Sequence, residues 1–397
     1  MTGAESPEES RSEELPLALL SGGPLYTLMV KAGIAKPGLT GIRLRILLSI
    51  AISWIPLALL TIAEGSFANS SLKVPFLYDF AEWCRFLFAL PLLIVAEYLI
   101  EPWLAQVIAH CRGLIETTDL EKFNEYVKAA LKSRDSVPVE LVLVLLAFIR
   151  PHFGDMMLSS KISTWHTVNT AGGEKAALAF LWYLFVAKPL IVLLWFRWLW
   201  KYAIWCRLLY RISKLDLRVM PTHPDRMGGL GFISVGQSRF AIIYFGFATV
   251  VASYLGEEIV FNGASLESFQ YVILAIVMIG LIVFLTPCLA FSPKLVDGKR
   301  RGLLQYTELA DRYTKEFHDK WILGKRKADE ELLGSGDIQS LADLGNSYEI
   351  VQSMSGVIIS KSTVMAYVVA SLLPFSPLLL TIYPFNEILA RIWKMVF

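Results

Sequence analysis

One stretch of the chain, Phe269 to Phe291, is apolar along its whole length and contains no charged residue. At 1.5 Å per residue, a helix of about 20 residues crosses the hydrocarbon core of a bilayer, and this stretch is long enough. Over the whole chain, 55% of residues are hydrophobic, which exceeds what a soluble fold of this size buries. Since only helices and closed barrels satisfy the backbone inside lipid, the sequence predicts a helical integral membrane protein.

Six further stretches are candidate spans, which predicts an all-α, polytopic fold with about seven transmembrane helices. Leu44 to Ala63 is the clearest of them, whereas Val137 to Ile149 is short, contains Glu140, and has the length of a buried or re-entrant helix. If this third stretch does not cross, the topology changes. The others are Trp83–Ile100, Ala176–Trp200, Phe240–Gly256 and Thr363–Tyr383.

Positive charge is distributed unevenly between alternate connecting segments. Residues 1–45, 102–136, 201–239 and 292–362 hold 28 of the 37 Lys and Arg residues, and the complementary loops hold six. Because short basic loops stay in the cytoplasm, the N-terminus is predicted to be cytoplasmic and, with seven spans, the C-terminus outside. The lipid bilayer is therefore the first predicted partner.

The chain divides into four predicted parts. Residues 1–43 form an acidic cytoplasmic tail, without a cleavable signal peptide, and an interfacial helix at Pro24–Gly33. Residues 44–291 form a six-span membrane domain that includes an amphipathic cytoplasmic hairpin at 102–136 and a loop at 215–239. Residues 292–362 form a cytoplasmic helical segment, and 363–397 hold the last span and a C-terminal tail.

The segment 292–362 shows two apolar stripes at helical spacing. Such stripes need cover, from each other, from the 102–136 hairpin, from a second copy in a homo-oligomer or from a cytoplasmic protein. The stripes are Tyr306, Leu309, Tyr313, Phe317 and Trp321, and Ile338, Leu341, Leu344, Tyr348 and Val351.

Trp195 to Lys214 extends the fourth span as a belt of aromatic and basic residues. Beside a membrane span, this pattern favours contact with lipid headgroups, and no nucleic-acid partner is expected.

Four charged residues lie within predicted spans: Arg85, Glu97, Glu140 and Lys188. A charge at mid-bilayer costs about 2.5 to 3.5 kcal/mol or more, and usually has a partner or faces water. Glu97 or Glu140 paired with Lys188 would form part of a gate or an ion relay. The alternative is a structural ion pair, or side chains that reach the nearest interface.

Metal and cofactor sites are not predicted. His110 stands beside Cys111, and His152, Asp155 and His166 share one predicted loop, but neither set has the spacing of a metal site. The four cysteines contain no CxxC pair and are expected to be free thiols.

The segment THPDRMGGLGF, Thr222 to Phe232, joins the basic extension to the fifth span. Its prolines and glycines predict a rigid elbow in which Asp225 caps the following turn. The alternative is a site at the membrane surface for a ligand or cation. Its candidate residues are His223, Asp225, Arg226, Gly228, Gly229 and Gly231.

HPDRMGGLGF, together with SLADLGNSYEIVQSM at Ser340–Met354, resembles a family of functionally uncharacterised bacterial multi-span membrane proteins that share an HPD-x-x-GGLG loop. The resemblance covers most of the chain from the first span onward. It implies a location in the bacterial inner membrane and implies no activity.

Three functions are compatible with these features. Intramembrane charges and proline-broken spans favour transport or a channel for an ion or small solute. The stripes of residues 292–362 favour a membrane scaffold or signalling protein. An enzyme that uses His223 and Asp225 is the weakest of the three, because the sequence has no nucleophile motif and no catalytic residue is assigned.

Overall fold

The computed structural model describes residues 18–36, 41–158, 164–170, 173–325, 331 and 334–381. Its described part is helical except for one two-stranded antiparallel ribbon. The α-helices are α1 (Pro24–Lys31), α2 (Ile42–Ala63), α3 (Phe80–Trp83), α4 (Leu90–Leu114), α5 (Leu120–Arg134), α6 (Val137–Leu158), α7 (Leu178–Trp182), α8 (Lys188–Ile212), α9 (Gly231–Ser238), α10 (Ala241–Asn262), α11 (Gln270–Leu289), α12 (Ser292–Phe317), α13 (Gly336–Ser353) and α14 (Lys361–Leu372).

Shorter elements connect these helices. The ribbon pairs β1 (Thr167–Thr170) with β2 (Gly173–Ala176). Three π-helical turns are η3 (Cys84–Ala89), η5 (Tyr183–Ala187) and η7 (His318–Ile322). The 3₁₀ turns are η2 (Phe76–Tyr78), η4 (Thr117–Asp119), η6 (Leu266–Phe269) and η8 (Leu373–Thr381).

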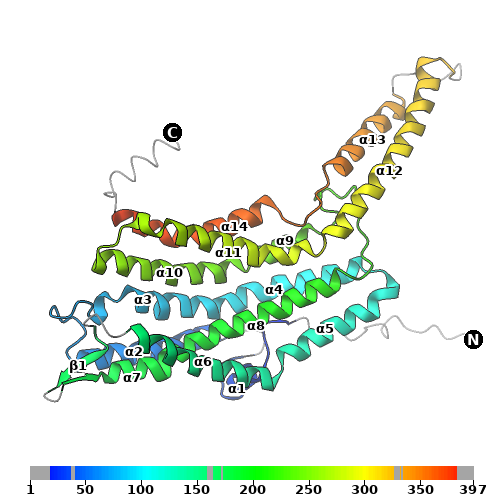
Figure 1. Ribbon diagram of the computed structural model, residues 1–397. Coiled ribbons are helices and arrows are strands. Elements are labelled where there is room, and N and C mark those ends of the chain that lie inside the picture. Colours follow the sequence, from blue (N-terminus) through cyan, green and yellow to red (C-terminus); the bar gives the residue numbers. More distant parts are fainter. Residues whose placement is uncertain are drawn as a thin grey trace, which may run out of the picture.

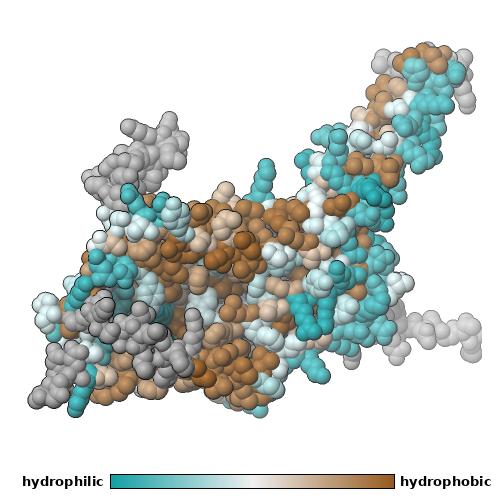
Figure 2. Space-filling model, viewed as in Figure 1, coloured by the Kyte–Doolittle hydropathy of each residue, from teal (hydrophilic) through white to brown (hydrophobic). Residues whose placement is uncertain are grey.

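Six continuous helical segments of the described chain are long and apolar enough to cross a membrane, as a helical polytopic fold requires. The surface between the two ends of the bundle is mostly apolar (Figure 2). These segments are Ile42–Ala63, Phe80–Leu114, Leu178–Ile212, Gly231–Asn262, Leu266–Leu289 and Lys361–Thr381.

The spans form two packed groups (Figure 1). Helix α14 contacts both α10 and α11, and α8 contacts α4, α5 and α6. Helix α4 lies between the groups, because it touches α2 and α8 on one side and α9 and α10 on the other.

The two ends of the bundle differ, and we name them by what they carry. Helices α12 and α13 project away from one end as a two-helix arm, which defines the arm end (Figure 1). The β1–β2 ribbon lies at the opposite end, the hairpin end, where Thr164 bridges Val74 in the loop after α2.

Helix α6 connects these two ends. It begins at Val137, directly after the α5 turn at the arm end, and the chain reaches Thr164 at the hairpin end. Its apolar part is the predicted Val137–Ile149, but the helix continues to Leu158 and spans about 33 Å at 1.5 Å per residue.

Three predicted segment boundaries were wrong. Residues 102–114 are not one arm of a separate hairpin, because they continue the second span as α4. Residues 231–239 are not loop, since α9 begins at Gly231 and leads into the fifth span. The predicted loop at 150–175 contains the end of α6 and the ribbon. In each case tertiary cover extends a helix or a strand pair past the apolar stretch that marks it in the sequence.

The predicted stripes of residues 292–362 lie in the arm, where α12 and α13 pack side by side. Tyr313, Phe317 and Leu344 are half-buried, while Leu309 and Ile338 remain exposed. Asp337 joins the two helices at the tip, because its carboxylate accepts bonds from Lys320 Nζ at 2.8 Å and Trp321 Nε1 at 2.9 Å.

Candidate functional site: two buried charged clusters

The four charged residues predicted within spans lie in two clusters at opposite ends of the bundle. Glu97 and Glu140 belong to the arm-end cluster, defined by Arg45, Glu97, Glu101, Glu140, Arg197 and Lys201. Arg85 and Lys188 belong to the hairpin-end cluster, defined by Asp79, Glu82, Arg85, Lys188 and Glu257.

Glu97 is the centre of the arm-end cluster. Arg45 Nη2, from α2, lies 2.6 Å from one carboxylate oxygen, and Lys201 Nζ, from α8, lies 2.5 Å from the other. All three side chains are buried, with 6% of their surface exposed. One carboxylate therefore ties α2, α4 and α8 together.

Glu140 makes a second ion pair beside the first. Arg197 Nε lies 3.1 Å from Glu140 Oε1, in ion-pair contact without hydrogen-bond geometry, which joins α6 to α8. The predicted pairing of Lys188 with Glu97 or Glu140 is therefore wrong. Their partners come from the far half of α8, nine and thirteen residues beyond Lys188.

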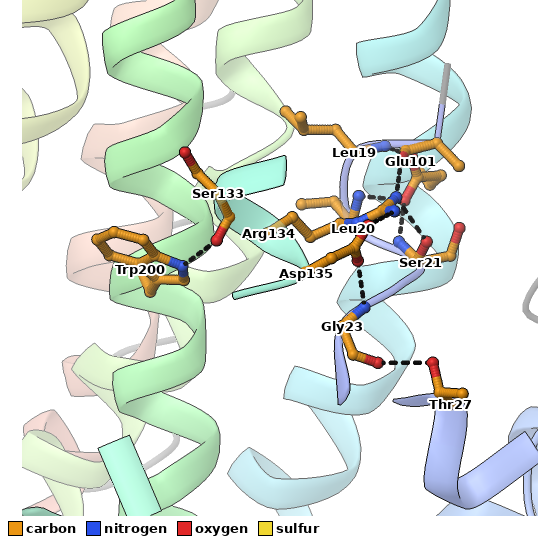
Figure 3. Close-up of polar contacts among 11 residues, drawn as sticks. Leu19, Leu20, Ser21, Gly23, Thr27, Glu101, Ser133, Arg134, Asp135 and Trp200 are labelled. Carbon is orange, nitrogen blue, oxygen red and sulfur yellow. Dashed lines mark hydrogen bonds and ion pairs between the residues drawn. The ribbon is translucent and has the colours of Figure 1, made fainter. Parts of the chain in front are cut away.

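A strap formed by residues 18–23 covers the arm-end cluster (Figure 3). The Glu101 carboxylate accepts three successive backbone N–H groups, from Leu19 at 2.5 Å, and from Leu20 and Ser21 at 2.6 Å each. Three aligned amides solvate a carboxylate as water would.

Helix α5 holds the other edge of the strap. Arg134 donates to the carbonyls of Ala18 and Ser21, and Asp135 accepts the Gly23 N–H at 2.9 Å. Gly23 has φ +95°, a backbone conformation that favours glycine, and its Cα faces Glu140 and Arg134. The strap thus closes the arm-end side of the paired charges.

Arg85 is the centre of the hairpin-end cluster. Its guanidinium contacts Glu82 and Tyr254, and donates to the Tyr183 hydroxyl at 2.7 Å. The Lys188 ammonium lies 5.3 Å from the centre of the Tyr183 ring, close enough to act on Glu82 electrostatically. Arg85 and Tyr183 come from the two π-helical turns η3 and η5, a local distortion that is frequent at functional sites.

Carboxyl groups outnumber cations in this cluster. Asp79 accepts the Trp165 indole N–H at 2.8 Å and the Glu82 amide at 3.0 Å. Glu257 accepts the Ala81 amide at 2.8 Å and lies within hydrogen-bonding reach of the Asp79 carboxyl. Glu82 Oε2 is buried and has no hydrogen-bond partner. Three carboxyls thus face two cations, whereas the arm-end cluster has three of each.

An apolar layer separates the clusters. Twelve residues, about 18 Å of helix, lie between Arg85 and Glu97. Within this interval Phe86, Ala89, Leu90 and Leu93 are buried, with at most 1% of their surface exposed.

The predicted elbow is built around Asp225. Its carboxylate accepts the amides of Met227 at 2.8 Å, Gly229 at 3.1 Å and Gly231 at 2.9 Å, so it caps the start of α9. His223 Nδ1 lies 2.8 Å from the same carboxylate. Burial raises the pKa of Asp225, but the three amide bonds and His223 outweigh it and hold the pKa below its usual value.

The backbone of the elbow explains its glycines. Gly228 and Gly229 have φ of +65° and +87°, and a Cβ at Gly228 would collide with Val219. Arg226 is a non-glycine residue with positive φ, at 55°, and its carbonyl accepts the Ser355 amide at 2.7 Å. A Cβ at Gly231 would press on the Asp225 carboxylate. The elbow therefore joins the base of the arm to α9.

The residues considered for metal binding do not converge in the described chain. His110 stacks against Phe232 with ring centres 4.6 Å apart, and Cys111 is buried. His166 packs among Trp165, Phe180 and Tyr183. The side chains of His152 and Asp155 lie outside the described residues. No described group of three His, Cys, Asp or Glu residues has metal-binding geometry, and all four cysteines are free thiols.

Sequence reasoning missed the partners of these charges. Arg45, Arg197 and Lys201 were interpreted as interfacial anchors, and Asp79, Glu82 and Glu257 were not singled out. One signal was present, since Glu97 and Glu101, like Arg197 and Lys201, are four residues apart and share one helix face. Two such faces of opposite charge predict neighbouring helices.

Comparisons with known proteins add no relative. No family model, no curated protein and no solved structure matches this chain. The function must therefore be argued from the clusters themselves.

Proposed function

We propose that this protein is a membrane transport protein that moves protons or a small monovalent cation, with the hairpin-end cluster as its loading site. The observation that carries the proposal is the charge imbalance of that cluster. Three buried or half-buried carboxyls surround two cations, so that one bound proton or monovalent cation neutralises it.

The contacts of the carboxyls suit this role. Two carboxyls within hydrogen-bonding reach, such as Asp79 and Glu257, share a proton readily because both cannot ionise at low cost. Glu82 Oε2 leaves one buried acceptor open beside them. The π-helical turns η3 and η5 supply a backbone that can return to regular helix as the load changes.

The apolar layer and the arm-end cluster form the closed side in this proposal. The layer blocks direct passage, so transport requires a rearrangement of α4 against α8. The strap on Glu101 and the ion pairs of Glu97 and Glu140 hold the arm end shut.

We also propose that the arm end faces the cytoplasm of a bacterial inner membrane. The uneven Lys and Arg distribution and the family resemblance support this orientation. The course of α6 from the arm end to the hairpin end supports seven crossings, with the N-terminus inside and the C-terminus outside.

Flux into proteoliposomes tests the function. Purified protein is reconstituted with a pH-sensitive dye or a cation indicator inside, and a membrane potential drives uptake. We expect Glu82→Gln and Glu257→Gln to lower uptake about tenfold or more, because each removes the imbalance. Lys188→Ala should alter uptake as well, since it removes one of the two cations.

Two variants serve as matched controls. Glu258→Gln changes the exposed acid next to Glu257, and His223→Ala changes the elbow; both should keep wild-type uptake. Wild-type uptake in Glu257→Gln, or no uptake by a folded and oriented wild-type sample, would contradict the proposal.

The arm supports a second candidate, a membrane scaffold or signalling protein that binds a cytoplasmic protein. Helix α12 alone is about 39 Å long, and the arm tip exposes apolar side chains, Ile322 at 65% and Leu323 at 56% (Figure 2). We expect Ile322→Glu with Leu323→Glu to remove a partner from pull-downs while the spans still insert. An unchanged set of partners would contradict this function.

A further inference from the structure

A cavity at the arm end lies outside both charged clusters. It has a volume of about 170 Å³ and lies between α5 and the last turns of α8. This volume is below the roughly 300 Å³ at which sites for whole small-molecule ligands begin. Its walls are formed by Tyr126, Ala129, Ala130, Ser133, Trp200, Ala203, Ile204, Arg207, Leu208 and Arg211.

The chemistry of the cavity is divided between its floor and its rim. Alanine, Ile204 and Leu208 side chains form an apolar floor, and two guanidinium groups, Arg207 and Arg211, stand at the rim. Arg211 lies over the Tyr126 ring at 5.3 Å, and the Trp200 indole is fixed by a bond to the Ser133 carbonyl at 3.3 Å. Within the described residues, no ion pair to a carboxylate occupies either guanidinium.

The depth of the cavity matches the polar edge of a bilayer. Arg207 lies six residues, about 9 Å, beyond Lys201, which is buried in the arm-end cluster. The headgroup layer is about 5 to 7 Å thick on each side of the hydrocarbon core. Exposed apolar residues continue from the cavity toward the core, with Leu199 62% exposed and Leu141 64% exposed.

We propose that this cavity binds the headgroup of an anionic phospholipid from the arm-end leaflet. Two arginines match a phosphodiester in charge and in planar donor geometry, and Trp and Tyr rings are favoured at this depth. The acyl chains would lie along the exposed apolar faces of α6 and α8. A soluble anion would use the guanidinium groups but would gain nothing from the adjacent apolar surface.

Lipid retention by the full-length protein tests the site. Detergent-purified protein is titrated with dioleoyl phosphatidylglycerol or dioleoyl phosphatidylcholine, and bound lipids are counted by native mass spectrometry. We expect saturable binding of one phosphatidylglycerol and none of phosphatidylcholine. Arg207→Gln and Arg211→Gln should each weaken binding about fivefold.

Two further variants separate a site from general charge attraction. Lys214→Gln removes the same charge just beyond Arg211 and should stay within about twofold of wild type. Ala203→Leu fills the cavity but keeps both guanidinium groups, and should weaken phosphatidylglycerol binding. Tryptophan fluorescence and elution volume confirm that each variant is folded.

Three outcomes would overturn the proposal. Equal weakening by Lys214→Gln would mean a diffuse surface potential, and unchanged binding in Ala203→Leu would place the lipid elsewhere. Displacement of phosphatidylglycerol by a molar excess of inorganic phosphate would assign the site to a free anion. None of these results depends on whether the protein transports ions.

Discussion

The two buried clusters contain the same kinds of side chain but differ in balance. At the arm end every carboxylate has a cation or a set of amides, and Glu97 alone receives Arg45 and Lys201. At the hairpin end three carboxyls face Arg85 and Lys188, and Glu82 keeps one buried oxygen without a hydrogen bond. The difference teaches that a charge inside a membrane protein points to function only when its partners fail to balance it.

Protein stability should separate the clusters most sharply through Glu97. Glu97→Ala leaves Arg45 and Lys201 buried without a carboxylate, so the free energy of unfolding should fall by about 3 to 5 kcal/mol. Thermal unfolding in detergent, followed by tryptophan fluorescence, measures this loss. Glu116→Ala, which removes an exposed partner of Arg218, should change it by less than about 1 kcal/mol. Equal losses in both variants would break the comparison.

Glu101 tests the strap that belongs to the balanced cluster. Glu101→Ala removes the acceptor of three amides and should cost about 2 kcal/mol, the scale of hydrogen bonds to a charged group. Hydrogen exchange at Leu19, Leu20 and Ser21 should accelerate. The exposed Glu125→Ala is the control, and unchanged protection of these amides in Glu101→Ala would show that the strap is held by other contacts.

Asp225 provides a balanced charge outside both clusters. Asp225→Asn weakens the cap of α9, and the free energy of unfolding should fall by about 1 kcal/mol at neutral pH. Because the folded pKa of Asp225 is lowered, its contribution is present above the unfolded pKa of about 3.9 and is lost as pH falls through the folded value. Acid unfolding curves of wild type and Asp225→Asn should therefore converge below pH of about 3 to 4. Curves that stay parallel would contradict this linkage.

Glu257→Gln should have the smallest effect on stability. It removes one carboxyl from a cluster that has one too many, so the free energy of unfolding should change by less than about 1 kcal/mol or rise. The thermal assay used for Glu97→Ala measures it under the same conditions. A loss as large as that of Glu97→Ala would mean that the hairpin-end cluster is structural as well.

Much of the elbow could be predicted from its residues. The prolines and glycines of residues 221–231 indicated a rigid turn, and Asp225 was correctly expected to cap the segment that follows it. These features are local, because the bonds join residues at most six positions apart. That the elbow holds the base of the arm through Ser355 could not be foreseen, since this contact joins segments more than a hundred residues apart.

By itself the sequence determined that the chain is a helical membrane protein, where most of its spans lie, and that an amphipathic helix pair follows the sixth. Each depends on local hydropathy and helical period, which act over one or two turns. Only the tertiary structure decided that Glu97 pairs with Lys201 rather than Lys188, and that Asp79, Glu82 and Glu257 meet around Arg85. The physical reason is that helix rotation and depth select the partner of a buried charge, and both are set by the packing of helices far apart in the sequence.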